Sequence, residues 1–363
     1  MVLKHMEEYR DAEISRSLVE KIKAASKKEI RLMEVCGTHT VSIFRSGIRS
    51  VLPETISLLS GPGCPVCVTA QREIDAFVAL SRVDGAIVAT FGDLMRVPGT
   101  VSSLQKEKAE GRDIRVVYST MDAIDLAVKH PDREVIFLGV GFETTAPTIA
   151  AAIQAARKMK LGNFSVYAAH KTVPPALNTL MSSELVNIDG FILPGHVSLI
   201  IGTSAYEPFF RNHNTPCVVA GFEPADILQA VWMLVDQIES DTPRLSNAYG
   251  RAVTREGNPK AKALLDEVFV VDDVVWRGIG VIPKSGLKIR DRFADFDAAR
   301  KFTLTLPDSQ DPAGCACGEI LTGVKTPPDC PLYKTRCTPM DPVGACMVSS
   351  EGTCAAYYRY HGK

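Results

Sequence analysis

Residues 134–147 read EVIFLGVGFETTAP, and this stretch decides the fold that we predict. A short apolar run, 134–140, is followed by Gly-Phe-Glu, and a helical pattern begins at Pro147. Apolar residues without alternation are typical of a strand that is buried on both faces of a parallel sheet. Residues 220–224, AGFEP, repeat the motif between another apolar run and another helical stretch. Both copies place a glutamate where open α/β sheets bind ligands, although a shared turn that needs glycine also explains them.

Outward from this stretch, short apolar runs alternate with helical patterns. The predicted strands lie at 30–35, 56–60, 85–90, 114–119, 134–140, 164–169, 190–193 and 216–220. The predicted helices lie at 11–28, 71–80, 121–130, 147–159, 176–184 and 224–239. Two further strands are expected at 268–274 and 276–281. The alternation predicts an α/β architecture with right-handed crossovers between parallel strands.

We predict three domains in the 363 residues. The first α/β unit covers 30–125, the second covers 130–240, and a third domain joins 1–29 with 241–363. From residue 306 onward Pro, Gly and Cys dominate, and hydrophobic periodicity is lost. A segment of that composition builds little core, so we expect a metal to determine its shape, within a module at 315–354.

The overall composition is that of a globular protein without a dominant charge. Hydrophobic residues make up 46% and charged residues 23%, the net charge is −1, and the pI is near 6.7. No global field therefore favours nucleic acid or an acidic membrane as a partner. The longest apolar runs are far too short to span a bilayer, and the N-terminus lacks the pattern of a signal peptide. We expect a cytoplasmic protein.

Most of the ten cysteines gather near the end of the chain, at 315, 317, 330, 337, 346 and 354. In a reducing compartment, clustered cysteines are more often metal ligands or redox groups than structural disulfides. Structural zinc sites usually show two tight Cys-x-x-Cys pairs, which this tail lacks, so we predict an iron–sulfur cluster. Zinc, disulfides and inert thiols are the alternatives. The preferred cluster ligands are Cys330, Cys337 and Cys354, with Cys317 or Cys346 as the fourth.

A second cysteine motif, GPGCPVC at 61–67, follows a predicted strand and precedes a helical stretch. A Cys-x-x-Cys pair at the start of a helix has a lowered thiol pKa and can cycle between dithiol and disulfide. We therefore predict that Cys64 and Cys67 are a redox pair. The alternatives are that both thiolates bind iron or zinc, or that the two cysteines only pack in a turn.

A third motif, EVCGTHT at 34–40, also ends a predicted buried strand. Cys36 and His39 are separated by Gly-Thr, so thiol and imidazole can face one ligand. They are candidates for a nucleophile and its base, or for a soft metal ligand and a neighbouring donor. The alternative is a lone cysteine that packs as a small hydrophobe. We expect that packing role for Cys217, which lies inside an apolar strand.

Polar side chains also follow later predicted strands. They are Glu143 and Thr145, His170 and Lys171, and His196 and Ser198. Because the carboxyl ends of parallel strands share one edge of a sheet, we expect these groups to line a cleft there. Each of them taken alone is also explained as a helix cap or a surface residue.

Together these motifs resemble one family, the hydrogenase maturation factors named HypD. The matching stretches are EVCGTHT (34–40), GPGCPVCV (61–68), GFETTAPT (141–148), LPGHVS (193–198) and a tail with CGE, DCP, CTP and GACMVSSEGTCAAYY in order. The resemblance runs essentially from end to end and includes all the motif cysteines. It implies a fold of two Rossmann-like α/β units and a domain that carries an iron–sulfur cluster.

The resemblance also implies a function. HypD proteins form a complex with the small chaperone HypC, and on this scaffold the Fe(CN)2CO unit of [NiFe]-hydrogenase is assembled. HypE, working with HypF, supplies the cyanide, and the iron is then passed to the hydrogenase large subunit. By similarity, Cys36 is the iron ligand from this chain, shared with the N-terminal cysteine of HypC, and His39 lies beside it.

The roles of further residues follow from the same resemblance. Cys64 and Cys67 are implied to be a redox pair near the iron and, like Cys36, candidate metal ligands, and we place Glu143 with these catalytic groups. The tail is implied to hold a [4Fe-4S] cluster in surroundings similar to those of ferredoxin–thioredoxin reductase. Because a cluster supplies single electrons and a dithiol exchanges two, we predict that the tail connects one-electron carriers to the dithiol.

Three other functions remain open. An iron–sulfur thiol–disulfide reductase would use the same cluster and the Cys64–Cys67 pair, but it would need neither Cys36 nor His39. A binding module would carry a cluster that is only structural. A nucleotide-using enzyme is the least favoured, because the chain has no Walker loop and Gly139-Val-Gly141 lacks a third glycine at dinucleotide spacing.

Overall fold

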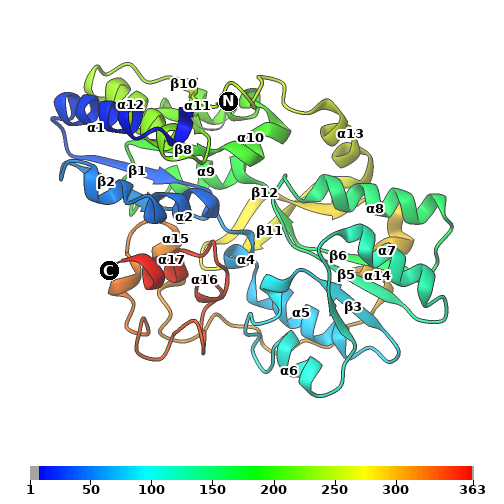
Figure 1. The fold of residues 1–363 in the computed structure, drawn as a ribbon. Coiled ribbons are helices and arrows are strands. Elements are labelled where there is room, and N and C mark those ends of the chain that lie inside the picture. The colour runs from blue at the N-terminus through cyan, green and yellow to red at the C-terminus, as the bar shows by residue number, and fades with distance from the viewer. Residues whose placement is uncertain (1–7, 362–363) are drawn as a thin grey trace.

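The computed structural model of the chain describes residues 8–361 and contains two parallel sheets (Figure 1). The first sheet has the strand order β10-β9-β8-β1-β2, and the second sheet has the order β4-β3-β5-β6. A small antiparallel sheet, β11-β12-β7, completes the β-structure of the described residues. The predicted α/β class with two parallel-sheet units is therefore confirmed.

The strands match the predicted apolar runs to within a few residues. Those of the first sheet are β1 (Ile30–Glu34), β2 (Ile56–Ser60), β8 (Gly190–Pro194), β9 (Cys217–Ala220) and the unpredicted β10 (Leu245–Asn247). Those of the second sheet are β3 (Ile87–Thr90), β4 (Ile114–Val116), β5 (Val135–Gly139) and β6 (Phe164–Ala168). Strand β5, from the stretch that decided the fold, is buried at every position and pairs with β3 and β6.

The pairing of the strands differs from the predicted units at 30–125 and 130–240. Strand β1 pairs with β2 on one side and with β8 on the other, so both ends of the α/β region contribute to one sheet. The chain leaves the first sheet after β2, builds the whole second sheet, and then returns. All these strands are short and apolar, and their local pattern does not specify which strand is the neighbour.

All six predicted helices are present, with ends shifted by up to three residues. They are α1 (Ala12–Ala25), α5 (Gln71–Ser81), α7 (Thr120–Lys129), α8 (Ala146–Lys158), α9 (Val173–Met181) and α12 (Pro224–Glu239). Helix α1 shows the features by which the sequence predicted a helix correctly. The Asp11 side chain accepts hydrogen bonds from the first-turn N–H groups of Glu13 and Ile14, as an N-cap does. Leu18, Val19 and Ile22 form its buried face.

The other α-helices, most of them shorter, were not predicted. They include α2 (Gly37–Arg45), α3 (Ile48–Val51), α4 (Pro65–Val68), α6 (Leu104–Ala109), α10 (Gly195–Ile201), α11 (Glu207–His213), α13 (Pro259–Val268) and α14 (Ala298–Lys301). The tail adds α15 (Cys317–Leu321), α16 (Ala345–Val348) and α17 (Thr353–Tyr360). Several of them are a single turn, which is too short to show a hydrophobic period.

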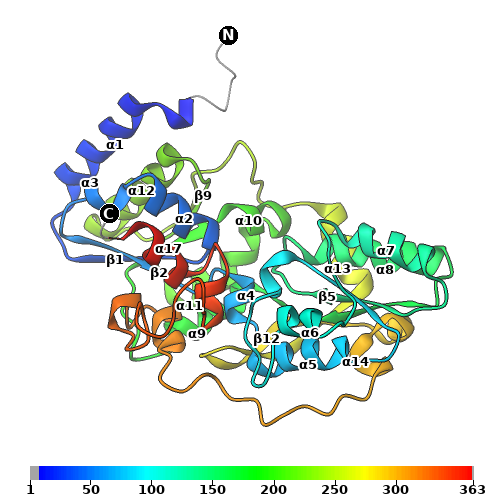
Figure 2. The same cartoon turned by 60° about the horizontal axis from the view of Figure 1, so that its bottom comes forward.

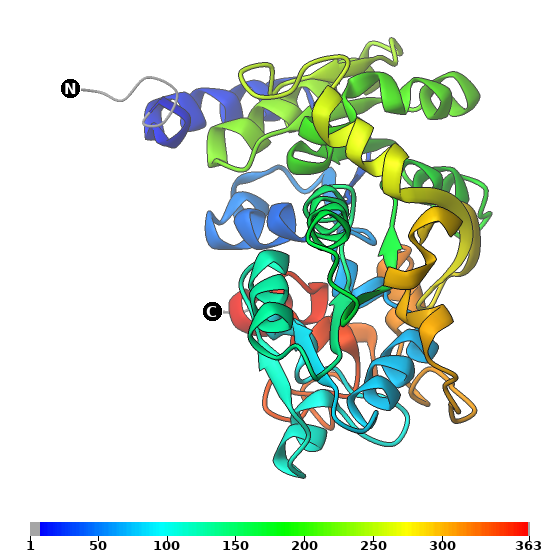
Figure 3. The ribbon, with the colours of Figure 1, turned by 90° about the vertical axis from the view of Figure 1, so that its right-hand side faces the viewer.

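The predicted strands at 268–274 and 276–281 form a hairpin with different bounds. The hairpin consists of β11 (Phe269–Trp276) and β12 (Gly280–Ile289), so the expected strand start at 276 is wrong. The turn lies at 277–279, where Gly278 has a φ of +71° that favours glycine. In Figure 3, helix α13 and this hairpin run along one side of the molecule.

The tail packs against the motif helices of the α/β region and not against the N-terminal helix. Helix α16 contacts α4, and α17 contacts α2, whereas α1 packs on α12 (Figure 1). A long segment without regular structure leads from α14 to this tail (Figure 2). The predicted grouping of 1–29 with 241–363 therefore does not describe how these segments pack.

His170 and Lys171 do not line a cleft as expected. They form β7 (His170–Lys171), which pairs with β12, and both side chains are buried. Lys171 Nζ donates hydrogen bonds to both carboxylate oxygens of Glu73, at 2.7 and 2.9 Å. Neither ring nitrogen of His170 has a partner within residues 8–361. The pair belongs to the interior between the sheets.

We expect Lys171→Met to lower the free energy of unfolding by about 3–5 kcal/mol, because it leaves the Glu73 carboxylate without its buried partner. Urea unfolding followed by circular dichroism measures this loss. The matched control is Lys301→Met, since Lys301 pairs with Glu134 at the same distance of 2.7 Å but is more exposed. That variant should lose less than about 1 kcal/mol. Equal losses in the two variants would contradict the assignment.

Candidate functional site

The first feature of the site is the contact between the loops that follow β1 and β2. The N–H of Gly61 donates to the carbonyl of Glu34, and the N–H of Gly37 donates to the carbonyl of Gly63, both at 2.8 Å. A side chain at Gly63 would overlap the backbone of Cys36. Only glycine allows this close approach, so the two cysteine motifs are held in direct contact.

Cys36 lies at the N-cap of α2 and is buried. Its backbone N–H donates to Glu34 Oε2 at 2.9 Å, which fixes the loop that carries the thiol. Burial raises the pKa of the Cys36 thiol to about 12, against the opposing effect of first-turn N–H groups of the helix. Without a metal the group is a neutral thiol, and a metal ion that binds here displaces its proton.

Glu34 is a site residue that sequence reasoning did not assign. Its carboxylate accepts the Cys36 N–H and, through Oε1, the Thr40 hydroxyl at 2.5 Å. Burial raises the pKa of this carboxyl to about 7. A signal was present in the sequence, because Glu34 ends a strand that is predicted to be buried, and a buried glutamate is rarely without a partner.

His39 is neutral and oriented by the second Gly-Phe-Glu copy. Its Nε2–H donates to the carbonyl of Gly221 at 2.8 Å, and its ring lies 4.7 Å from the ring of Phe222. Burial lowers the pKa of His39 to about 4. Nδ1 is buried, without a hydrogen-bond partner in the described chain, and keeps a free lone pair.

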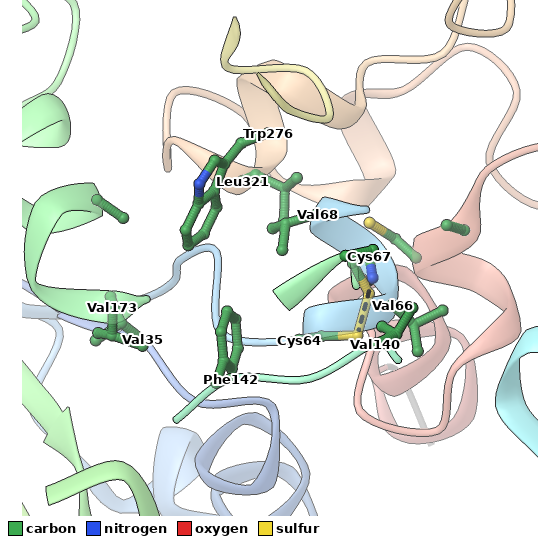
Figure 4. Close-up of a cluster of buried hydrophobic side chains, with 14 of the residues drawn as sticks. Val35, Cys64, Val66, Cys67, Val68, Val140, Phe142, Val173, Trp276 and Leu321 are labelled. Carbon is green, nitrogen blue, oxygen red and sulfur yellow. Dashed lines mark hydrogen bonds between the residues drawn. A yellow bond between two sulfur atoms is a disulfide. The ribbon is translucent and has the colours of Figure 1, made fainter. Parts of the chain in front are cut away.

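Cys64 and Cys67 form a disulfide across the first turn of α4, with their Cα atoms 5.3 Å apart. Figure 4 shows this bond in an apolar cluster with Val66 and Val140 around it. Both cysteines are buried, with 4% and 0% of their surfaces exposed. Helix α16 of the tail packs directly on this helix. The pair is therefore shielded from solvent and lies next to the tail.

Glu143 faces the same region from the second sheet. Its Oε1 accepts the N–H of Val173 at 2.9 Å, while Oε2 is buried without a partner among residues 8–361. Burial raises the pKa of Glu143 to about 7. Burial also raises the pKa of Tyr206, whose ring belongs to the same core cluster as Phe142 and Val173.

The 193–198 motif brings two more groups to the site. Ser198 and Tyr206 share a hydrogen bond between their hydroxyl oxygens at 3.1 Å. The His196 ring stacks on Phe222 at 3.9 Å, on the same phenylalanine that His39 contacts. Glu143 follows β5 of the second sheet, whereas His196 and Ser198 follow β8 of the first, so these groups do not lie along one sheet as predicted. Cys217 is fully buried in β9, which confirms its packing role.

The glutamates of the two Gly-Phe-Glu copies lie in different surroundings. Glu143 is buried, whereas Glu223 binds Arg10 with two hydrogen bonds of 2.7 and 2.8 Å near the surface. The second copy contributes its glycine carbonyl and phenylalanine ring to the site. Both copies of the motif therefore contribute to the site, but through different atoms.

Cys354 packs against two core clusters that contain tail thiols, one with Cys317 and Cys346 and one with Cys330. Burial raises the pKa of Cys354 well above its usual value, and neighbouring thiols raise it further, in the order Cys317, Cys315, Cys337 and Cys330. The sixth tail thiol, Cys346 Sγ, lies 3.4 Å from Cys317 Sγ. All six are free cysteines in this structure. Sequence reasoning left Cys315 out of the ligand candidates.

The tail supplies the donor type of a sulfur-ligated cluster. The six gathered groups are all thiols, which suit iron–sulfur clusters. Within residues 8–361, no group of three or more His, Cys, Asp or Glu side chains is arranged to hold a metal ion. This leaves the cluster and its four ligands as a prediction.

Known proteins match this chain over nearly its whole length. The family described as "HypD: Hydrogenase formation hypA family" matches residues 13–361. The chain is 46% identical to the "Hydrogenase maturation factor HypD" of Cupriavidus necator and 45% identical to that of Azotobacter vinelandii, over 99% of this chain and 97% of each relative. The chain belongs to the HypD family. A putative hydrogenase expression/formation protein of Methanocaldococcus jannaschii is 42% identical over 96% of this chain and 98% of its own length.

Membership of the HypD family supports a role in hydrogenase maturation. Within this family fold, the loops of Cys36 and His39 and of Cys64 and Cys67 are in contact. Glu143 joins them through its neighbour Phe142 and its partner Val173, which share one core cluster with Val35 and Cys64. It places His170 and Lys171 elsewhere, in the interior. No helix within residues 8–361 has the length and apolarity to cross a bilayer.

Glu143 gives this HypD-family chain a testable pH dependence. Its pKa in the folded state, about 7, lies above the usual value of 4.5, so the folded state favours the protonated carboxyl. The stability that this group contributes is complete below about pH 4.5 and is lost as the pH rises to about 7. We expect the free energy of unfolding of wild type to fall by roughly 3 kcal/mol between these pH values because of Glu143, and Glu143→Gln to lack this fall.

Urea unfolding of wild type and variant at pH 5 and pH 8 measures this difference. The effects of Glu34, His39 and His170 are common to both proteins and cancel. The matched control is Glu223→Gln, because Arg10 lowers the pKa of Glu223. That control should show no gain in stability at pH 8 relative to pH 5. An identical pH dependence in Glu143→Gln and wild type would refute the assignment.

Proposed function

We propose that this chain, with a HypC-type chaperone, is the scaffold on which the Fe(CN)2CO unit of [NiFe]-hydrogenase is assembled. The observation that carries the proposal is the direct contact of the Cys36 loop with the Cys64 loop through Gly63. In this contact the loop of the buried Cys36 thiol lies against the loop of the Cys64–Cys67 disulfide, which supports a joint role in metal binding and two-electron exchange. The iron is the cargo of this site, and a HypE-type protein delivers the cyanide.

Cys36 binds the iron as a thiolate, the soft donor that low-spin iron with cyanide and CO prefers. Burial makes the free thiolate unfavourable, so iron binding and proton loss occur together. His39, one helical turn from Cys36, stays neutral because burial lowers its pKa to about 4, and its Nδ1 keeps a free lone pair. Glu34 holds the loop in place through the Cys36 N–H and the Thr40 hydroxyl.

Cys64 and Cys67 supply the redox step of the proposal. Reduction of their disulfide takes up two electrons and two protons and yields two thiols. A [4Fe-4S] cluster, held by four of Cys317, Cys330, Cys337, Cys346 and Cys354, would supply electrons one at a time. The packing of α16, which carries Cys346, on α4 supports this connection.

The surface beside Cys36 suits a partner that shares the iron. A cavity of about 710 Å³ opens over helix α2 and is lined by Thr38, Ser42, Phe222 and Glu351 among others. Thr38 donates a hydrogen bond to Glu351 Oε1 at 2.7 Å, so the tail closes one wall of this cavity. A HypC-type chaperone that inserts its N-terminal cysteine here completes the ligands of the iron.

Infrared spectroscopy of the chain, purified without oxygen together with its HypC-type partner, tests the proposal. Bands of iron-bound cyanide and CO are expected in the complex and not in the chain prepared alone without iron. A complex that contains iron but shows no such bands, although a HypE-type donor was present, would exclude the scaffold function.

A thiol–disulfide reductase of the ferredoxin–thioredoxin type is the second candidate, because the disulfide lies against the tail. The burial of Cys64 and Cys67 argues against it, since a protein disulfide as substrate must contact an attacking sulfur. This function would also leave the arrangement of Glu34, Cys36 and His39 without a role.

A further inference from the structure

Arg251 lies in the loop between β10 and α13 and binds a buried carboxylate. Its Nη1 and Nη2 donate hydrogen bonds to Oδ1 and Oδ2 of Asp226, both at 2.6 Å. Asp226 belongs to the first turn of α12, and only 2% of its surface is exposed. The Arg251 guanidinium carbon also lies 3.6 Å from the ring centroid of Tyr9 and 4.5 Å from that of Tyr249. A bidentate ion pair and two aromatic contacts therefore fix the guanidinium in place.

Two partners of Arg251 converge on the turn of the second Gly-Phe-Glu copy. A side chain at Gly221 would overlap both Asp226 Oδ2 and the ring of Tyr249. Asp226 Oδ2 also accepts the backbone N–H of Glu223 at 3.2 Å. Gly221 thus packs directly against two groups that Arg251 holds, and its carbonyl has a fixed direction.

The Gly221 carbonyl is the polar anchor of His39. It accepts the hydrogen bond from Nε2–H at 2.8 Å, while Nδ1 has no partner within residues 8–361. A carbonyl oxygen only accepts, so the ring nitrogen that faces it carries the proton, and in a neutral imidazole the other nitrogen keeps the lone pair. The Phe222 ring, 4.7 Å away, packs on the imidazole without distinguishing its two nitrogens. The position of the carbonyl therefore selects the tautomer of His39.

Capping of helix α12 does not by itself explain Arg251. An aspartate in the first turn that accepts the N-cap N–H stabilises a helix start without help from a cation. A second arginine, Arg10, binds the same turn through the Glu223 carboxylate near the surface. The two arginines hold different groups of one turn, and those held by Arg251 are the ones that touch Gly221.

We propose that Arg251 is a positioning residue for His39: through Asp226 and Tyr249 it fixes the Gly221 carbonyl, which keeps the ring proton on Nε2 and leaves the Nδ1 lone pair free. Arg251 itself does not touch the reacting groups. The effect on the His39 tautomer is a property of the chain alone. Only the use of that tautomer in the assembly of the iron unit rests on the proposed function.

The first experiment measures the His39 tautomer in the full chain without iron. The protein is labelled with ¹⁵N-histidine, and two-bond nitrogen–proton spectra are recorded near neutral pH, with the His39 signals assigned by their loss in His39→Gln. Wild type should show the Nε2–H form. Arg251→Met should shift the ratio of tautomers about tenfold towards Nδ1–H, because the hydrogen bond to a fixed carbonyl is lost. Arg251→Lys keeps the charge but not the two-pronged geometry, and it should shift the ratio about threefold.

Two controls separate positioning from stability. Arg10→Met removes the other arginine of the turn and should leave the His39 tautomer ratio unchanged, since Arg10 binds only the exposed side of the turn. Lys171→Met destabilises the protein elsewhere and should also keep the wild-type ratio. A shift in Lys171→Met as large as that in Arg251→Met would assign Arg251 a merely structural role and overturn the proposal.

The second experiment compares the infrared bands of cyanide and CO in the complex with the HypC-type chaperone, at equal iron content. If Arg251 acts through His39, the double variant Arg251→Met/His39→Gln should lose no more band intensity than His39→Gln does. Losses that multiply in the double variant would show that Arg251 acts by another route. Absence of the bands in wild type would count against the proposed function, while the tautomer ratio would still decide the role of Arg251.

Circular dichroism checks the fold of each variant. If Arg251→Met does not fold, Arg251→Lys decides the question through its smaller shift of the His39 tautomer ratio. The proposal is overturned if the folded variant, Arg251→Met or in its place Arg251→Lys, shows the wild-type ratio.

Discussion

Cys36→Ser is expected to remove the infrared bands of cyanide and CO from the purified complex, with a loss of ligand-bearing iron of more than tenfold. Serine keeps the size and the N-cap position of Cys36 but replaces the soft sulfur donor by a hydroxyl that does not ionise near neutral pH. The Glu34 contact with the backbone N–H of residue 36 is retained, so the loop keeps its shape. The loss therefore reports on the thiolate itself.

The control for this variant is Cys217→Ala, which removes another fully buried thiol outside the site. It should keep the bands, with at most a moderate loss of stability from the small cavity. Bands of wild-type intensity in Cys36→Ser, at equal iron content, would show that the iron ligand is another group.

Cys64→Ala is expected to have the second largest effect. The variant should bind iron at Cys36 but accumulate less than a tenth of the wild-type cyanide and CO bands, because the two-electron step at the disulfide is lost. The remaining Cys67 thiol cannot form the internal disulfide, which alkylation and mass spectrometry verify. Quantitative infrared spectroscopy with iron analysis separates loss of ligand assembly from loss of iron.

Val66→Ala is the matched control, since Val66 lies between the two cysteines in the same buried turn. It should assemble the iron unit normally while losing some stability from the lost methyl groups. Normal assembly in Cys64→Ala would exclude a redox role for the pair and would favour a purely structural disulfide.

The contact between the two cysteine motifs was accessible from the sequence in part. Both motifs follow buried strands, and the carboxyl ends of parallel strands meet at one edge of a sheet. Strands β1 and β2 are indeed neighbours, so Cys36 and the Cys64 loop meet there. The sequence pattern did not predict the close approach of the two loops at Gly63, because this approach depends on the exact path of both loops.

Other groups lie at the site because of strand pairings that no local sequence pattern encodes. Glu143 comes from the second sheet and His196 from the first, because the chain completes the second sheet between β2 and β8. Arg277, in the turn of the β11–β12 hairpin, was missed entirely, since an arginine in a turn reads as a surface residue. Only 2% of its surface is exposed, because the hairpin packs against the end of α4 and against the tail.

The amino-acid sequence alone determined the α/β class, the strands and long helices, and the cysteine, histidine and glutamate motifs. These depend on residue order over a few neighbours, through hydrophobic period, capping and turn preferences. Only the tertiary structure decided which strands share a sheet and that Lys171 forms an ion pair with Glu73 in the interior. It also decided that Arg277 lines one cavity with Cys315 and Cys317. Those outcomes depend on burial and on compensation of charge between segments far apart in the chain, and no short stretch of sequence contains that information.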